Sequence, residues 1–123
     1  MRTILIAIGL VSVLGGAAFA AGPAKMVDTK MGKAWADEKG MTLYTFDKDA
    51  KDKSNCDKSC LKKWPAFHAA AGAKAEGDWS LVKAADGMEM WAYDGKPLYT
   101  YAKDKKAGET NGDGVGGIWH LAK

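Results

Sequence analysis

The sequence predicts a mainly β domain built from two copies of one structural unit, and three observations lead to this fold class. The stretch LYTFDKD, which begins at Leu43, recurs almost unchanged as LYTYAKD from Leu98. The same shift of 55 positions superposes Trp64 on Trp119. Each copy also contains short aromatic and β-branched runs separated by turn residues, a pattern typical of strands joined by hairpins.

Each copy is expected to form a three-stranded antiparallel meander. The first strands are expected at residues 25–27 and 79–82, and a hairpin then joins an aromatic strand to the repeated LYT strand. Asp94-Gly95 is a strong two-residue turn signal in the second copy, whereas the first copy has a longer turn at residues 37–40. A single meander cannot bury its own aromatic face. We therefore expect both to pack with pseudo-twofold symmetry as one small sandwich or barrel-like domain.

The repeated motif is interpreted as structural. Strand geometry places its two aromatic side chains on one face, where they can enter the core. An aspartate at the end of a strand readily accepts hydrogen bonds from the following backbone amides, and we favour this role over an acid/base pair. The repeated structural set comprises Tyr44, Phe46, Asp49, Trp64, Tyr99, Tyr101, Asp104 and Trp119.

A long excursion follows each repeated strand, and the two excursions differ. The first is expected to hold a short helix near Cys56-Lys63 that ends before Pro65. The second is rich in glycine from Gly108 to Gly117, which does not favour a helix. The two copies therefore diverge most in these excursions.

Residues 1–20 have the features of a secretory signal peptide. Arg2 precedes an apolar run, and the segment ends in Ala18-Phe19-Ala20, which matches an A-x-A cleavage site. The run is shorter than the ~20 residues that span a bilayer. Removal of this segment is expected to leave one domain, residues 21–123, with repeats at about 24–70 and 78–123.

Composition and cysteine usage indicate which partners the protein can have and in which compartment it folds. The chain has a formal net charge of +3, and every cation after Arg2 is lysine. The absence of arginine after the predicted signal peptide argues against nucleic-acid recognition. Cys56 and Cys60 are expected to form a disulfide in an oxidising compartment, with a redox-active pair as the alternative. Neither cysteine lies at the cleavage site, so we expect an unlipidated periplasmic or secreted protein, without a membrane span and monomeric.

Several motifs in the same order resemble the bacterial secreted-repeat family, described as predicted lipoproteins with a Tyr-x-[Phe/Trp/Tyr]-x-x-Asp motif. The motif occurs at residues 44–49 and 99–104, and it is accompanied by CDKSCLKKWP, DGKPLY and TNGDGVGGIWH. The resemblance covers nearly all of residues 21–123 and implies bacterial origin and export. It implies no mechanism, because the function of the family is unassigned. The sequence departs from the lipoprotein label in lacking a lipid-accepting cysteine.

Two metal-site hypotheses arise from the sequence, although no cofactor is expected. Glu109, Asn111 and Asp113 have the spacing of a calcium loop, but His120 stands where a bidentate glutamate is needed. A plain glycine-rich turn is favoured. Thioether and imidazole groups suit copper in the periplasm, but methionines near strands are more often core residues. The candidate copper ligands are Met88, Met90 and His120.

No hydrolase motif occurs in the chain, so we expect a non-enzymatic protein. The first functional hypothesis is a periplasmic binding or interaction module for an unknown protein or small ligand. Its contact surface is expected at the glycine-rich loop from Gly108 to His120, with exposed aromatic residues that include Trp119. The alternative is an accessory in envelope redox or copper handling that uses the cysteine pair or the methionine and histidine side chains.

Overall fold

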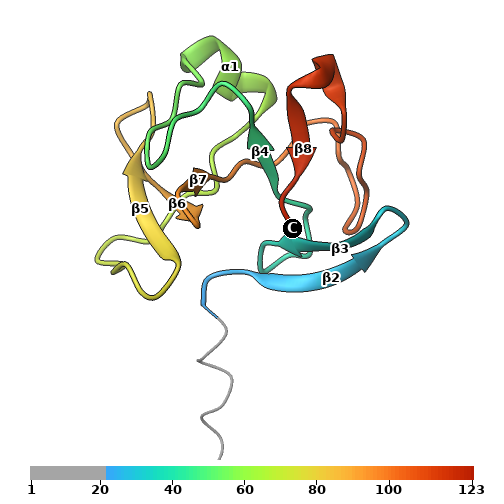
Figure 1. Ribbon diagram of the computed structural model, residues 1–123, viewed down its shortest axis with the longest axis horizontal. Coiled ribbons are helices and arrows are strands. Elements are labelled where there is room, and N and C mark those ends of the chain that lie inside the picture. Colours follow the sequence, from blue (N-terminus) through green and yellow to red (C-terminus); the bar gives the residue numbers. More distant parts are fainter. Residues whose placement is uncertain (1–21) are drawn as a thin grey trace, which may run out of the picture.

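The computed structural model describes residues 22–123, and the predicted signal peptide, residues 1–20, lies outside the described residues. The described part is mainly β, with three antiparallel sheets and one short α-helix, and it forms no closed barrel (Figure 1). The mainly β fold class is thus confirmed. The elements are β2 (Lys25–Thr29), β3 (Gly32–Ala36), β4 (Tyr44–Phe46), α1 (Lys58–Lys63), β5 (Trp79–Lys83), β6 (Glu89–Tyr93), β7 (Lys96–Pro97), the 3-10 turn η3 (Val115–Gly117) and β8 (Trp119–Leu121).

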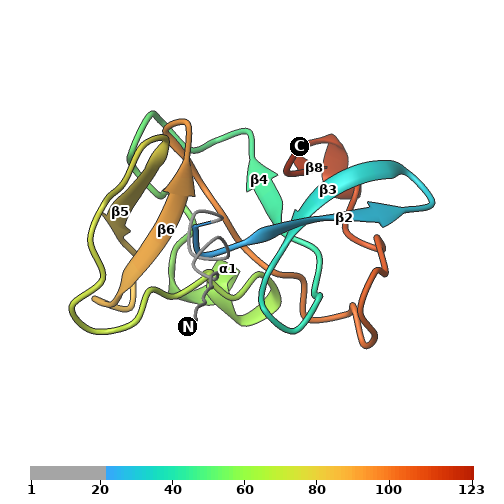
Figure 2. The same ribbon diagram turned by 90° about the horizontal axis from the view of Figure 1, so that it is seen from below.

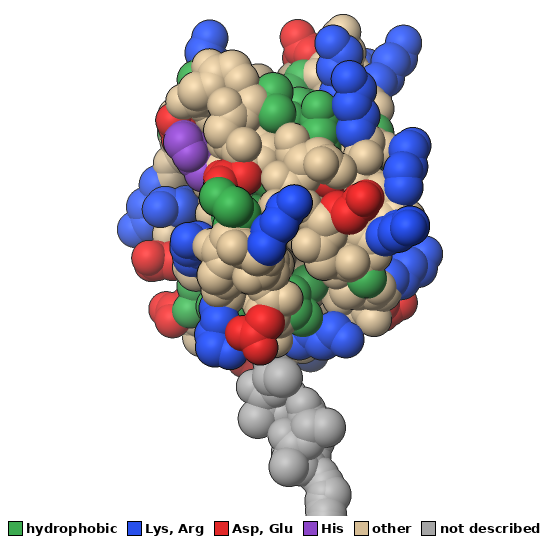
Figure 3. Space-filling model, turned by 90° about the vertical axis from the view of Figure 1, so that its right-hand side faces the viewer, with side chains coloured by type: hydrophobic (Ala, Val, Ile, Leu, Met, Phe, Trp, Pro, Cys, Tyr) green, Lys and Arg blue, Asp and Glu red, His purple; other side chains and the backbone are tan. Residues whose placement is uncertain are grey.

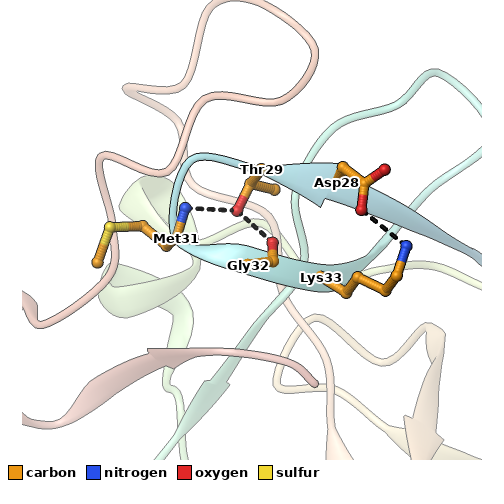
Figure 4. A network of polar contacts seen from close by, with 5 residues as sticks. All are labelled: Asp28, Thr29, Met31, Gly32 and Lys33. Atoms are coloured by element: carbon orange, nitrogen blue, oxygen red, sulfur yellow. Dashed lines mark hydrogen bonds and ion pairs between the residues drawn. The ribbon is translucent and has the colours of Figure 1, made fainter.

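The first repeat opens with the β2–β3 hairpin, whose turn is held by side-chain contacts (Figure 4). Thr29 Oγ1 accepts a hydrogen bond from Met31 N at 3.0 Å and donates one to the Gly32 carbonyl at 2.6 Å. Behind the turn, Lys33 Nζ contacts Asp28 Oδ1 at 2.7 Å, but both side chains are exposed. Such surface pairs contribute little to stability, so the Thr29 contacts are the main local determinant of this turn.

The second repeat forms the three-stranded sheet β5–β6–β7 on the opposite side of the molecule (Figures 1 and 2). Asp94 and Gly95, which join β6 to β7, have φ angles of 51° and 80°. Positive φ at both central residues is the requirement of a type I′ hairpin turn. The predicted Asp94-Gly95 turn is therefore confirmed. The third strand of this sheet is Lys96–Pro97, whereas the sequence predicts it at the repeated LYT stretch from Leu98.

The pairing of β4 differs from the expected meander. The first repeat has a two-stranded sheet that only a bridge between Ala36 and Thr42 extends. The strand β4 pairs with β8 of the second repeat, with Tyr44 opposite Leu121 and Phe46 opposite Trp119. Figure 1 shows β8 beside β4, away from the sheet of its own repeat. The equivalent strand of the second repeat crosses in the same way, since Tyr99 bridges Ala66. Each repeat therefore completes the other.

The two crossing strands meet at Tyr44 and Tyr99. Tyr44 N donates to the Tyr99 carbonyl at 2.7 Å, and Tyr99 N donates to the Tyr44 carbonyl at 3.0 Å. Reciprocal bonds between equivalent residues are what pseudo-twofold symmetry requires at its axis. Both side chains are fully buried, so this contact lies at the centre of the core.

Two groups of buried residues make up the core. One surrounds Tyr44 and Tyr99 and includes the stacked Trp64 and Trp119, and the other contains Trp79 with further apolar side chains from both repeats. Trp119 is only 4% exposed. The expectation that it forms part of an exposed aromatic contact surface is therefore wrong, because β8 carries its ring inward between the repeats.

The first excursion contains the predicted helix and disulfide. Asp57 caps α1, and its Oδ1 accepts a hydrogen bond from Cys60 N at 2.8 Å. Cys56 and Cys60 are bonded to each other, with their Cα atoms 5.2 Å apart, which confirms the predicted disulfide. The second excursion contains only the short 3-10 turn η3. The disulfide therefore stabilises the first excursion and has no counterpart in the second.

Lysine and acidic side chains are interspersed over the face drawn in Figure 3. The large apolar side chains exposed in the described part of the chain are Met26, Met31 and Met88. Among residues 22–123, no helix has the length and apolar character needed to cross a membrane.

Candidate functional site

Each motif tyrosine donates a hydrogen bond to the motif aspartate of the other repeat. Tyr44 Oη lies 2.6 Å from Asp104 Oδ2, and Tyr99 Oη lies 2.7 Å from Asp49 Oδ2. Tyrosine hydroxyls that bind carboxylates form charge-assisted hydrogen bonds, which are stronger than neutral ones. The motif therefore joins the two repeats to each other, and we refer to this pair of contacts as the crossed Tyr–Asp bonds.

The second carboxylate oxygen of each aspartate accepts a backbone amide. Asp49 Oδ1 accepts from Asn55 N at 2.6 Å, and Asp104 Oδ1 accepts from Asn111 N at 3.0 Å. The sequence predicts that these aspartates bind following amides, and both do so. Asn55 follows Asp49 by six residues and Asn111 follows Asp104 by seven, so each aspartate fixes the first part of its divergent excursion.

Burial shifts the titration of this network. It raises the pKa of Asp49 above that of an ordinary aspartate, and the hydrogen bonds from Asn55 N and Tyr99 oppose that rise. Burial also raises the pKa of the Tyr44 and Tyr99 hydroxyls far above their usual range. Both tyrosines therefore remain protonated donors at any pH at which the protein works.

Four aromatic rings form a stacked column through the first core group. Trp64 and Trp119 lie at its centre, with ring centroids 3.7 Å apart and planes inclined by 1°. Phe46 stacks on Trp119 at 4.2 Å, and Tyr101 stacks on Trp64 at 4.1 Å. The two inner rings are buried, whereas the two outer rings are partly exposed. We call this set the aromatic column.

Two adjoining clefts lie along β4, and together they form what we call the β4 groove. Thr45, Asp47, Asp94 and Lys96 line both clefts. The first cleft has a volume of about 380 Å³, and the second about 290 Å³. The first cleft is also lined by Phe46, Asp49 and Lys51, and the second by Trp35, Tyr93 and His120.

The β4 groove contains a histidine–aspartate pair. His120 Nε2 lies 2.8 Å from Asp47 Oδ2, and both side chains are about half exposed. The pair forms because β8 places His120 opposite Thr45, two residues before the aspartate. The positions that the repeat symmetry makes equivalent to Asp47 and His120 are Ala102 of the second repeat and Pro65 of the first. The pair therefore breaks the symmetry of the duplicated fold.

A third cleft, of about 610 Å³, occupies the equivalent place on the other repeat and is here called the Trp91 groove. Trp91 and Thr100 line it, as their counterparts Trp35 and Thr45 line the second cleft. His68 also lines it, and its Nε2 contacts Asp86 at 3.1 Å. Asp37, Glu38 and Lys39 also line this groove, but most of its other residues are small and apolar, so it offers fewer charged contacts than the β4 groove.

The candidate copper ligands occupy different environments. Met90 is fully buried in the core, whereas Met88 is 54% exposed. The His120 side chain contacts Asp47. His68, and not His120, forms an isolated antiparallel β-bridge with Met90. Among residues 22–123, no group of three or more histidine, cysteine and acidic side chains is placed to hold a metal ion.

The candidate calcium ligands bind backbone amides. Glu109 Oε1 accepts from Lys106 N at 2.9 Å and from Lys105 N, and Asp113 Oδ1 accepts from Leu121 N at 3.2 Å. The amide of Asn111 binds Asp104. These contacts pin the glycine-rich loop to the rest of the domain, in keeping with the favoured interpretation of the loop as a turn.

The crossed Tyr–Asp bonds and the β4 groove were not predicted from the sequence. A signal for the first existed, since a tyrosine and an aspartate recur together in both copies at the same spacing. The groove had no comparable signal, because its walls come from β3, β4, the β6–β7 turn and β8.

The family model described as a secreted repeat of unknown function matches residues 25–68 and again residues 80–123. The chain belongs to this secreted-repeat family. The two matches correspond to the two halves that exchange strands and Tyr–Asp bonds, so the resemblance noted in the sequence is confirmed. No curated protein and no solved structure matches the chain.

Proposed function

We propose that this secreted repeat is a non-enzymatic binding module of the bacterial periplasm, and that it takes a small ligand in the β4 groove. The observation that carries this proposal is the His120–Asp47 pair, which stands in the groove, whereas Pro65 and Ala102 occupy the two symmetry-related positions. Polar side chains in a concave site fix the orientation of a ligand, and apolar walls supply contact area. The groove combines both features.

Electrostatics favour the β4 groove over the Trp91 groove as the binding site. Asp47, Asp94, Lys51 and Lys96 provide charges of both signs around the clefts. Asp49, a half-buried carboxylate with a raised pKa, lies in the same wall. Perturbed carboxylates next to a cleft are more frequent at functional sites than elsewhere.

The periplasmic location and the absence of a lipid anchor rest on the cysteines. Both cysteines of the chain are used in the Cys56–Cys60 disulfide, so neither is free for acylation. Stable disulfides form in oxidising compartments. The alternative role, in envelope redox or copper handling, would appear as bound metal or free thiols in native mass spectrometry of the protein purified from its own periplasm.

The binding proposal is tested by NMR titration of ¹⁵N-labelled protein with a panel of saccharides, short peptides and planar heteroaromatic compounds. We expect at least one member to shift amide signals along the β4 groove. His120→Ala should weaken that binding at least about fivefold, since a lost hydrogen bond to a charged group costs on the order of 1.5 kcal/mol.

His68→Ala is the matched control, because His68 is also partly exposed and also pairs with an aspartate, but lies in the Trp91 groove. It should leave the binding unchanged. Shifts confined to the Trp91 groove, or an equal effect of both substitutions, would refute the assignment of the site.

A further inference from the structure

The aromatic column ends at the wall of the first cleft. Phe46 stacks on Trp119 and also lines this cleft together with Asp49 and Lys51. Tyr101 holds the equivalent place at the other end of the column, and none of the clefts described above includes it. One end of a symmetric stack of rings is therefore associated with a cleft.

The Phe46 ring is held in place before any ligand arrives. It stacks on Trp119 at 4.2 Å with planes inclined by 12°, and the edge of Tyr99 approaches it at a centroid distance of 6.5 Å. Aromatic rings gain most from offset-stacked and edge-to-face neighbours. A ligand that stacks on a ring already fixed in this way immobilises few additional degrees of freedom.

The first cleft has the size and the polar groups for a substituted ring system. Its volume of about 380 Å³ lies in the range of small-molecule sites. Lys51 and Lys96 lie on its wall, as does Asp94 of the β6–β7 turn. None of these three side chains has an ion-pair partner within the described residues.

We infer that the first cleft binds a planar aromatic or heteroaromatic ligand that stacks on Phe46 and extends the aromatic column by one ring system. Polar substituents of the ligand contact Lys51, Lys96 and Asp94, and the second cleft accepts any extended side chain of the ligand beside His120. This inference rests on the proposed binding function and names the ligand class for the same groove.

The inference is tested with two matched pairs of probes in NMR titrations. Riboflavin and adenosine each carry a planar heteroaromatic system, and ribitol and ribose are the polar parts of these molecules without the ring. We expect riboflavin or adenosine to shift amides of β4 and the β6–β7 turn, and ribitol and ribose to cause no shift there at the same concentration.

Substitutions at the two ends of the aromatic column provide the control. Phe46→Leu keeps an apolar side chain of similar size but removes the ring, and should weaken binding of the planar probe at least tenfold. Phe46→Trp should retain binding. Tyr101→Leu removes the equivalent ring at the far end and should leave the affinity within about twofold, with a comparable loss of stability showing that both variants perturb the column.

The outcomes distinguish a wrong ligand class from a wrong assignment of the binding function. If saccharides or peptides shift the groove and neither riboflavin nor adenosine does, the ligand class is wrong and the binding function stands. Equal affinity of the wild type and the Phe46→Leu variant for a planar probe also overturns the inference. If no compound of either panel shifts the groove, both are overturned.

Discussion

The two repeats contain the same interior and different surfaces. Tyrosine and aspartate at the motif positions, and tryptophan at the end of each excursion, are identical in both copies and lie in or next to the shared core. Asp47 and His120 have no such counterparts, since Ala102 and Pro65 replace them. The repeated residues therefore join the two halves, whereas the divergent residues make one of the two symmetry-related grooves polar.

The largest loss of stability is expected from removal of either of the two inner rings of the aromatic column. Trp64→Ala and Trp119→Ala each remove a buried ring from the 3.7 Å stack, so each should lower the free energy of unfolding by about 3–5 kcal/mol. Chemical denaturation followed by far-ultraviolet circular dichroism measures both. Because the column is symmetric, the two losses should agree within ~1 kcal/mol. An unchanged free energy of unfolding for only one of the two variants would show that the two repeats do not share one aromatic column.

The second prediction concerns the other contact of each motif tyrosine, which differs between the halves. Tyr44 Oη accepts a hydrogen bond from Gly112 N at 3.2 Å, whereas Tyr99 Oη contacts Ser54 Oγ at 2.6 Å. A Cβ at Gly112 would lie 2.8 Å from the Trp64 ring. Gly112→Ala should therefore cost about 1–3 kcal/mol through overpacking.

Ser54→Ala is the comparison, since it removes only one hydrogen bond and should cost about 1 kcal/mol. Thermal unfolding of both variants gives the ranking. A larger loss for Ser54→Ala than for Gly112→Ala would mean that the glycine-rich excursion is not packed against the core as described.

The third prediction uses pH to examine the Asp49 side of the network. Burial raises the pKa of Asp49 in the folded state, so the folded protein binds a proton there more tightly than the unfolded chain. Asp49 therefore opposes folding at neutral pH, and this opposition disappears as the pH falls through the raised pKa toward the ordinary aspartate value of ~4.

The measurement is the free energy of unfolding between neutral pH and about pH 4 for the wild type and for Asp49→Asn, which cannot ionise. Acidification should stabilise the wild type relative to the variant across this range. A relative loss of wild-type stability on acidification would mean that the pKa is lowered and that the carboxylate is better solvated than its burial indicates.

The smallest effect on stability is expected at the divergent surface. His120→Ala and His68→Ala each remove one partly exposed histidine–aspartate contact, and each should change the free energy of unfolding by less than ~1 kcal/mol. Differential scanning calorimetry checks this. A loss several times larger for His120→Ala would indicate that the pair stabilises the fold and is not reserved for a ligand.

The local features of the fold were predictable from the sequence because local interactions determine them. Asp94-Gly95 forms its turn through backbone preferences of two residues, and the disulfide joins cysteines only four positions apart. The repeated LYT strand follows from its alternating pattern. These signals require no knowledge of which segments meet in space.

The crossing of the repeats was not predictable in the same way. A strand such as β4 has two edges, and nothing in Tyr44–Phe46 specifies that one of them pairs with β8 rather than with a strand of its own repeat. The short strand β8 directly follows a glycine-rich stretch and has no strand pattern of its own in the sequence. Trp119 was therefore interpreted as part of an exposed loop. The β4 groove depends on this crossing, because His120 reaches Asp47 only through the pairing of β4 with β8.

The motif tyrosine of each repeat binds the motif aspartate of the other, and a pair of double-mutant cycles measures this contact. One cycle combines Tyr99→Phe with Asp49→Ala, which are in contact across the repeats at 2.7 Å. The other combines Tyr44→Phe with Asp49→Ala, two residues of one repeat that do not bind each other. We predict a coupling energy of about 1–3 kcal/mol in the first cycle and less than ~0.5 kcal/mol in the second. Coupling within one repeat and none across the two would contradict the account.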